Sequence, residues 1–226
     1  MKLAVLLSGS GVYDGSEMTE ATSILIHLSR AGCEYQCFAP DQDQMHVVNH
    51  ITGEPIEGET RNVLLESARI ARGDVKVLTD LKMEDYDAIV VPGGFGVAKN
   101  LCNLAVKGKD MEVDPVVDKL LKEFHEAKKP IGLSCIAPVL GAKSLPDGVI
   151  ITMGMEAGDD FPHSWAIPAA QAVGAAHVEE SGTKAVVDPI NKVVSCVAYM
   201  YSGKPHEIYE SIGSMIDEVV KMLDEQ

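Results

Sequence analysis

A cysteine at the junction between an apolar strand and a following helix constrains this chain more than any other feature. Residues 129–138 read KPIGLSCIAP, in which Ile131 and Leu133 predict a short buried strand and the residues after Cys135 predict a helix. Such a turn holds a cysteine at the carboxyl edge of a sheet. The positive end of the next helix then favours the thiolate. The same geometry carries the nucleophilic serine of the α/β-hydrolases, so Cys135 is the candidate nucleophile.

Apolar runs and helical periodicities alternate along the rest of the chain. The opening strand–helix–strand pattern predicts a parallel, right-handed unit. The whole alternation predicts an α/β fold, an open parallel sheet with helices on both faces, and the absence of a linker predicts one domain over residues 1–226. The expected strands are 2–8, 34–39, 75–78, 88–91 and 131–134, with a small β elaboration near the C-terminus at 149–152, 178, 185–187 and 193–196. The expected helices are 17–30, 60–71, 98–104, 165–173, one from Asp114 and one from Pro205.

Three loops follow strands of this predicted sheet, namely Gly9–Ser16, Pro92–Gly96 and Cys135–Ala137. Ligands of open parallel sheets bind beyond the carboxyl ends of the strands, so all three loops should face one crevice. The adjacent glycines of the second loop let backbone N–H groups point inward, and the amides of Gly94 and Ile136 are the predicted oxyanion hole. The chain lacks a complete GxGxxG fingerprint and a Walker A motif. We therefore expect no cofactor.

A carboxylate and a histidine are the expected partners of the thiol. Glu17 opens the first predicted helix, where an acid is favoured by the helix dipole alone. From that place its carboxylate is also expected to reach the crevice and move a proton for Cys135. A Cys–His pair is the usual way to activate a thiol, yet isoleucine follows this cysteine. The candidates elsewhere in the chain are His50, which is preferred, His163 and His206.

The charge balance and the cysteines limit the class of protein. The chain has 34 acidic and 19 basic residues, a formal net charge of −15, so we expect no nucleic-acid partner and no binding to anionic membranes. None of the five cysteines forms a CxxC pair, and no His/Cys pattern has zinc spacing, so no metal is expected. An odd cysteine count without a signal peptide predicts a reducing compartment, the cytoplasm or, for a processed form, the mitochondrial matrix.

Several stretches together resemble one family. They are GSGVYDGSE (9–17), NHITGE (49–54), ETRNVLLESARIARG (59–73), PGGFGVAKNL (92–101) and GLSCIAPVL (132–140). These motifs are similar to those of the ElbB family, within the class I glutamine amidotransferase-like, PfpI-type superfamily. The resemblance implies a flavodoxin-like sandwich, a homodimer, Cys135 as the elbow cysteine and Glu17 as its carboxylate partner. It also implies glyoxalase III-type or deglycase-like activity on small aldehydes.

Three functions follow from these observations. The first is a cofactor-free lyase that uses Cys135 and Glu17, with His50 as a possible third member, to convert glyoxal or methylglyoxal to 2-hydroxy acids. The second is a non-catalytic redox- or stress-responsive protein in which Cys135 is the oxidisable group. The third is a glutamine amidotransferase with an unusual triad. Glutaminases and PfpI-type peptidases place histidine differently from this chain, so the first function is favoured.

Overall fold

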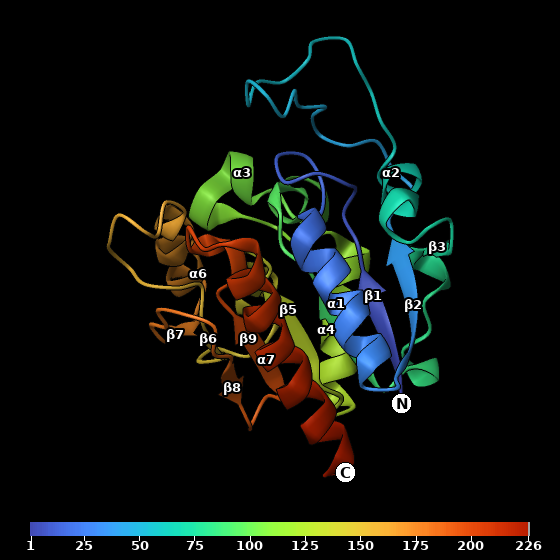
Figure 1. The fold of residues 1–226 in the computed structure, drawn as a ribbon, viewed down its shortest axis with the longest axis vertical. Helices are drawn as coiled ribbons and strands as arrows, with labels where there is room; N and C mark the ends of the chain where they lie inside the picture. The colour runs from blue at the N-terminus through green and yellow to red at the C-terminus, as the bar shows by residue number, and fades with distance from the viewer. Residues whose placement is uncertain (226) are drawn as a thin grey trace.

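The computed structural model describes residues 1–225 and is built around a seven-stranded sheet (Figure 1). Its strand order is β3–β2–β1–β4–β5–β9–β8, and every neighbouring pair is parallel except β8 with β9. This is the predicted flavodoxin-like α/β sheet. The strands are β1 Lys2–Leu6, β2 Glu34–Ala39, β3 Val75–Val77, β4 Ala88–Val91, β5 Ile131–Ser134, β8 Val186–Asp188 and β9 Val193–Cys196.

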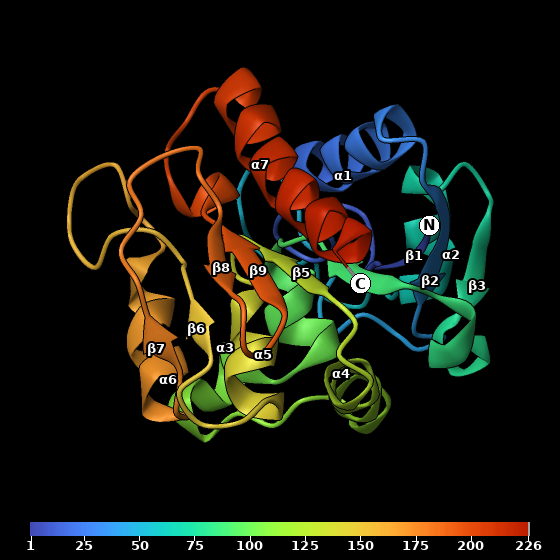
Figure 2. The ribbon, with the colours of Figure 1, turned by 90° about the horizontal axis from the view of Figure 1, so that it is seen from below.

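Helices cover both faces of this sheet. In Figure 2, α1 and α7 lie on one face and α4 and α5 on the other, so the central strands are buried on both sides, as their continuous apolar sequences require. No helix among residues 1–225 is long and apolar enough to cross a bilayer. The helices are α1 Met18–Arg30, α2 Val63–Ile70, α3 Leu104–Lys107, α4 Pro115–Glu126, α5 Pro138–Ser144, α6 Ile167–Ala172 and α7 Pro205–Asp224.

Capping side chains determine where the outer helices begin. Asp114 accepts hydrogen bonds from the Val116 and Val117 amides at 2.9 and 3.3 Å, with proline at the start of α4. Asn62 accepts from the Leu65 amide at 3.0 Å, so α2 begins at Val63 rather than at residue 60. The cap therefore shortens the helix that apolar periodicity predicted over residues 60–71.

Three short elements differ from the predictions. The helix expected over 98–104 is a π-helical turn, Val97–Leu101, followed by α3. The helix expected over 165–173 begins as a 3₁₀ turn, Ser164–Ala166, before α6. The strand expected at Val178 is displaced, because β7 (Ala176–His177) pairs instead with β6 (Ile150–Ile151) in a separate two-stranded sheet.

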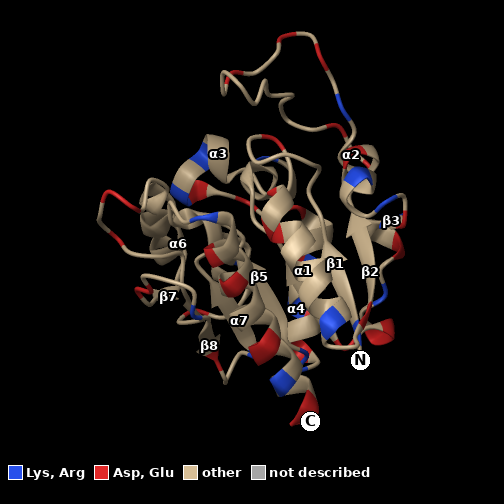
Figure 3. Cartoon of the chain, viewed as in Figure 1, with Lys and Arg blue, Asp and Glu red and all other residues tan. Residues whose placement is uncertain are grey.

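A long connection joins β2 to α2 and projects away from the sheet in Figure 1. Only one isolated bridge, between Val48 and Pro55, closes its outer part, and Ile51 near its tip is 96% exposed. Acidic residues occur along this connection and along α7 (Figure 3). The acidic residues Asp14, Glu20 and Asp188 are buried instead.

Candidate active site

Cys135 directly follows β5 and has a backbone φ of 59°, a left-handed conformation that is rare for a side chain other than glycine. The turn is held by hydrogen bonds from the Cys135 amide to the Cys196 carbonyl at 3.0 Å and from the Ala137 amide to the Ser134 carbonyl at 2.9 Å. The predicted strand-to-turn placement of the cysteine is confirmed. Such strained backbone is concentrated at functional sites, which is consistent with a role for the thiol.

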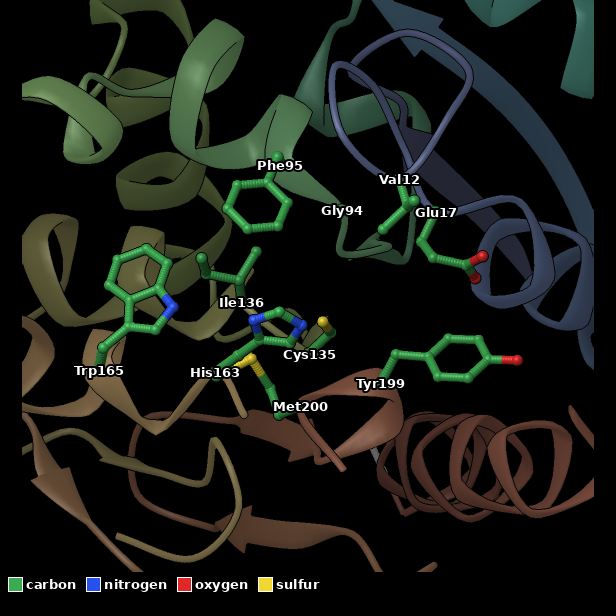
Figure 4. Close-up of a pocket in the computed structure, with 10 residues that line it drawn as sticks. All are labelled: Val12, Glu17, Gly94, Phe95, Cys135, Ile136, His163, Trp165, Tyr199 and Met200. Atoms are coloured by element: carbon green, nitrogen blue, oxygen red, sulfur yellow. The ribbon is translucent and has the colours of Figure 1, made fainter. Parts of the chain in front are cut away.

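The thiol lies at a small cavity of about 30 Å³ (Figure 4). The predicted meeting of three loops in one crevice is confirmed, because each of them contributes to the lining, together with residues from the C-terminal third. The lining residues are Val12, Glu17, Gly94, Phe95, Cys135, Ile136, His163, Trp165, Tyr199 and Met200. Only 6% of Cys135 is exposed to solvent, so a reactant must enter this cavity to reach the sulfur.

Glu20 is the carboxylate that lies beside the Cys135 thiol, where it acts to raise the pKa of that thiol. Glu20 is fully buried, and three donors hold it. Its Oε2 accepts from the Gly93 amide at 2.8 Å and from the Ser134 hydroxyl at 3.0 Å, and its Oε1 accepts from the Tyr199 amide at 3.2 Å. Buried polar atoms need such partners, and here they fix the carboxylate beside the sulfur.

Gly93 leaves the space in which these two groups meet. A Cβ at this position would lie 2.8 Å from Glu20 Oε2 and 2.9 Å from the Cys135 sulfur, too close for any side chain. The first glycine of the Pro92–Gly96 turn is therefore required by the close approach of Cys135 and Glu20.

Burial shapes the acid–base properties of the pair. Removal from water, together with the negative charge of Glu17, raises the pKa of Glu20 to about 7 against the lowering effect of its hydrogen bonds. Burial and the neighbouring Glu20 raise the pKa of the Cys135 thiol well above its ordinary value. The expectation that the following helix favours thiolate is therefore wrong for the resting site, since desolvation outweighs the two amides that stabilise the anion.

Glu17 does not occupy the position predicted for it. Its side chain caps α1 by accepting a hydrogen bond from the Glu20 amide at 2.7 Å, and its carboxylate points away from Cys135 in Figure 4. It still lines the cavity, and burial raises its pKa. The carboxylate beside the thiol comes one helical turn later, because a residue at the cap lies outside the helix face that packs on the sheet.

The sequence does contain a signal for Glu20. This residue precedes Ile24 by four positions and Leu28 by eight, so it lies on the buried stripe of α1. An acid at a position of such a stripe where an apolar residue is expected marks a buried carboxylate. Glu20 also lies in the first turn of the helix, where acids are common on exposed faces as well. Its position alone therefore does not distinguish a buried carboxylate from an exposed one.

The two predicted oxyanion-hole amides face the sulfur. The N–H groups of Gly94 and Ile136 lie close enough to Cys135 to act to lower the pKa of its thiol. Gly94 has a φ of 100°, and a Cβ there would meet backbone atoms of residues 15–17. Only glycine fits this turn, which is what brings its amide into the cavity.

His50 is not part of this cavity. Its Nδ1 lies 3.0 Å from the Val48 carbonyl, its Nε2 accepts from the Tyr13 amide at 3.2 Å, and the same nitrogen is 3.8 Å from Asp14. These contacts fasten the long connection after β2 to the Gly9–Ser16 loop. The prediction of His50 as a catalytic member is wrong because the chain uses its ring as a structural link.

His163, the alternative candidate, does line the cavity. Its ring packs edge-on against Phe95 with centroids 5.8 Å apart, and burial lowers its pKa, which favours the neutral imidazole. No hydrogen bond joins it to Cys135 within residues 1–225. His206 is exposed in the first turn of α7, away from the cavity lining.

Comparison with known proteins identifies the family of this chain. Residues 11–197 match the DJ-1/PfpI family. The chain belongs to the DJ-1/PfpI family. It is 51% identical over 223 residues to the Homo sapiens glutamine amidotransferase-like class 1 domain-containing protein 3, mitochondrial, covering 98% of this chain and 83% of that protein.

Two solved structures extend the comparison. An isoprenoid biosynthesis protein with amidotransferase-like domain from Ehrlichia chaffeensis is 37% identical, with a TM-score of 0.89 over 99% of both chains. Glyoxalase III from Candida albicans is 16% identical, with a TM-score of 0.62 over 96% of this chain and 97% of the other. The second likeness shows a shared fold, and the first shows a nearer relative within the DJ-1/PfpI family.

The buried carboxyl predicts a specific dependence of stability on pH in this DJ-1/PfpI protein. The folded-state pKa of Glu20, about 7, lies above the ordinary value of 4.5. Its contribution to the free energy of unfolding is therefore fully present below pH 4.5 and is lost as the pH rises through 7. The difference corresponds to about 3 kcal/mol. In urea unfolding at pH 4.5, 6 and 7.5, the free energy of unfolding of the wild type should decline as the pH rises. In Glu20→Gln this decline should be smaller by an amount of that size. Parallel pH profiles in the two proteins would contradict it.

Proposed function

We propose that this DJ-1/PfpI protein is a cofactor-free, cysteine-dependent enzyme that converts small reactive aldehydes such as glyoxal or methylglyoxal to 2-hydroxy acids. The observation that carries the proposal is the Cys135 sulfur at a small cavity, beside the carboxylate of the fully buried Glu20. The pKa of Glu20 near 7 suits a group that both accepts and returns protons at neutral pH.

The first step joins the thiol to the aldehyde carbon. The Cys135 sulfur forms a bond to that carbon while its proton passes to Glu20, and the electron pair of the C=O bond moves to oxygen. The amides that now face the sulfur, those of Gly94 and Ile136, lie where they can donate to the new oxyanion. Glu20 then protonates this oxygen, which gives a neutral hemithioacetal.

The second step moves hydrogen within the bound substrate. Glu20 removes the proton from the former aldehyde carbon, and the electrons form an enediolate with the neighbouring carbonyl. Return of that proton to the second carbon, with transfer of the hydroxyl proton to its oxygen, gives a thioester of the 2-hydroxy acid. Water cleaves the C–S bond and restores the thiol, so the net change is addition of one water and no outside oxidant is needed.

The size of the cavity supports a small substrate. About 30 Å³ is far below the roughly 300–1,000 Å³ that encloses a drug-sized ligand, so a reacting end of only a few heavy atoms fits beside the sulfur. The apolar side chains of Val12, Ile136 and Met200 help to exclude water there.

The relatives support three finer assignments. The Candida albicans neighbour, which has the same fold, is named glyoxalase III, and this is the kind of activity proposed here. The likeness to the Ehrlichia chaffeensis protein supports placement near the ElbB branch of the family. The name of the human relative supports a mitochondrial location, the second of the two compartments expected from the sequence, whereas the first, the cytoplasm, gains no support from it.

The other two functions are less consistent with this site. A redox sensor needs an accessible thiol with a low pKa, whereas burial and Glu20 raise the pKa of Cys135. Glutamine hydrolysis needs a histidine that activates the thiol. Among residues 1–225 Cys135 has a carboxyl partner instead.

The test is direct. The purified protein, without glutathione or metal, is expected to convert methylglyoxal to lactate, followed by ¹H NMR, and to release no ammonia from glutamine. Ammonia release without lactate formation would reject the proposal in favour of the amidotransferase. Stoichiometric oxidation of Cys135 by mild peroxide, seen by mass spectrometry without aldehyde turnover, would reject it in favour of the redox-responsive protein.

A further inference from the structure

A second, larger hollow lies beside the active-site cavity and shares two of its walls. This outer groove has a volume of about 370 Å³ and is lined by Tyr13, Gly53, Phe95, Lys99, Ala105 and Trp165. Phe95 and Trp165 line both spaces. In Figure 4 they stand together on one side of the cavity, opposite Glu17 and Tyr199. A molecule whose reactive end occupies the inner cavity would therefore extend along these two rings.

Three of the six residues that line this groove are aromatic. Phe95 and Trp165 are stacked, with centroids 6.3 Å apart and planes 23° from parallel, and the Tyr13 ring lies near Phe95 with centroids also 6.3 Å apart. Trp165 is 48% exposed and Tyr13 is 37% exposed. Partly exposed, mutually packed rings present flat apolar faces on which a planar group can stack.

Lys99 supplies a positive charge at the same place. It is part of the π-helical turn Val97–Leu101, a deviation from the α-helix that is frequent at functional sites. Its Nζ donates to the Tyr13 carbonyl at 2.7 Å and lies 5.7 Å from the centre of the Phe95 ring. In a chain of net charge −15, a half-buried lysine fixed beside aromatic rings selects an anion over a cation.

We propose that this groove is an outer substrate subsite that binds a planar, negatively charged group attached to the carbonyl carbon chain. The inference rests on the proposed function, because it assigns the outer part of the same substrate. The class of substrate is then a carbonyl compound with an aromatic or other planar portion bearing an anionic group. The planar portion stacks on Trp165 and Phe95, and its anionic group pairs with Lys99.

The experiment measures binding in Cys135→Ala, so that it does not depend on turnover. Trp165 is the single tryptophan of the chain, and its fluorescence reports on this groove. The probe is 4-acetylbenzoate, a planar ketone with a carboxylate. Saturable quenching of the Trp165 fluorescence by 4-acetylbenzoate is expected. Neutral acetophenone and the non-planar 4-acetylcyclohexanecarboxylate should each bind about tenfold more weakly, because each lacks one of the two contacts.

Variants separate charge from folding. Lys99→Gln should weaken 4-acetylbenzoate binding about tenfold and leave acetophenone unchanged, whereas Lys99→Arg should largely restore the binding of the anion. Lys107→Gln removes an exposed positive charge from α3, outside the groove, and should have no effect. Trp165→Leu, followed by calorimetry because the reporter is lost, should weaken the planar probe more than the non-planar one.

Two results would overturn the subsite. One is the absence of saturable binding of 4-acetylbenzoate to Cys135→Ala. The other is an affinity for 4-acetylbenzoate that stays the same when Lys99→Gln is added to Cys135→Ala. Either result beside normal methylglyoxal turnover by the wild type rejects the subsite and leaves the proposed function standing. Binding as expected in a protein that turns over no aldehyde retains the groove as an anion-binding site but rejects its assignment as a substrate subsite together with the function.

Discussion

Replacing Cys135 with Ala is expected to reduce conversion of methylglyoxal to lactate to the uncatalysed rate. The variant removes the sulfur that forms the covalent bond to the aldehyde carbon, and no other cysteine lines the cavity. The substitution removes one atom from a buried site and keeps the same backbone, so the protein should remain folded by circular dichroism. ¹H NMR of the lactate methyl signal gives the measurement.

Cys37→Ala is the matched control for this variant. Cys37 is buried in β2, away from the cavity, and burial raises the pKa of its thiol to about 12. Its removal tests whether the loss of any buried thiol lowers activity by destabilising the fold. Turnover by this variant should be preserved at 25 °C. Lactate formation that persists in Cys135→Ala would reject the covalent mechanism.

Replacing Glu20 with Gln is expected to lower kcat by roughly 10²–10⁴, the usual contribution of a positioned acid–base group. The amide has nearly the shape of the carboxyl but cannot take the proton from Cys135 or from the substrate carbon. Its NH₂ group would also face one of the donors that now hold the carboxylate, the Gly93 or the Tyr199 amide. Steady-state kinetics across pH 5–9 should show that the limb associated with a pKa of about 7 is lost with the carboxyl.

Glu17→Gln is the control that separates the two acids of α1. It keeps the side-chain oxygen that accepts from the Glu20 amide, so the helix cap should survive. We expect less than about a tenfold change in kcat, because Glu17 lines the cavity without contacting the sulfur. A large loss in Glu17→Gln with little change in Glu20→Gln would reverse these roles and restore the assignment made from the sequence.

Local patterns were sufficient for the architecture. The apolar runs of β1, β4 and β5 predicted strands buried on both faces, and their alternation with amphipathic helices predicted a parallel sheet. The positions of the loops after those strands then predicted the crevice, because parallel strands end at the same edge. Capping was the part that periodicity missed, as at Asn62, because a cap depends on one side chain rather than on a repeating pattern.

The partners of the thiol were harder to predict, because they depend on distances between elements. The place of His50 on a loop makes it a candidate, yet its ring is held by Tyr13 and Val48. The sequence makes His163 a candidate without a preferred role. In the folded protein the C-terminal third packs against the Pro92–Gly96 turn, and His163 contacts Phe95. Nothing in the local sequence of either histidine records these contacts.

The sequence by itself determined that Cys135 directly follows a buried strand and that the glycine-rich turn Pro92–Gly96 follows another strand. It also determined that Gly94 and Ile136 can present amides to Cys135. These are consequences of local backbone geometry. Only the tertiary structure decided that Glu20 rather than Glu17 lies beside the sulfur, since the packing of α1 on the sheet selects which acid turns inward. It also decided that the thiol is held neutral, because the pKa of a buried group depends on how much water the surrounding fold removes.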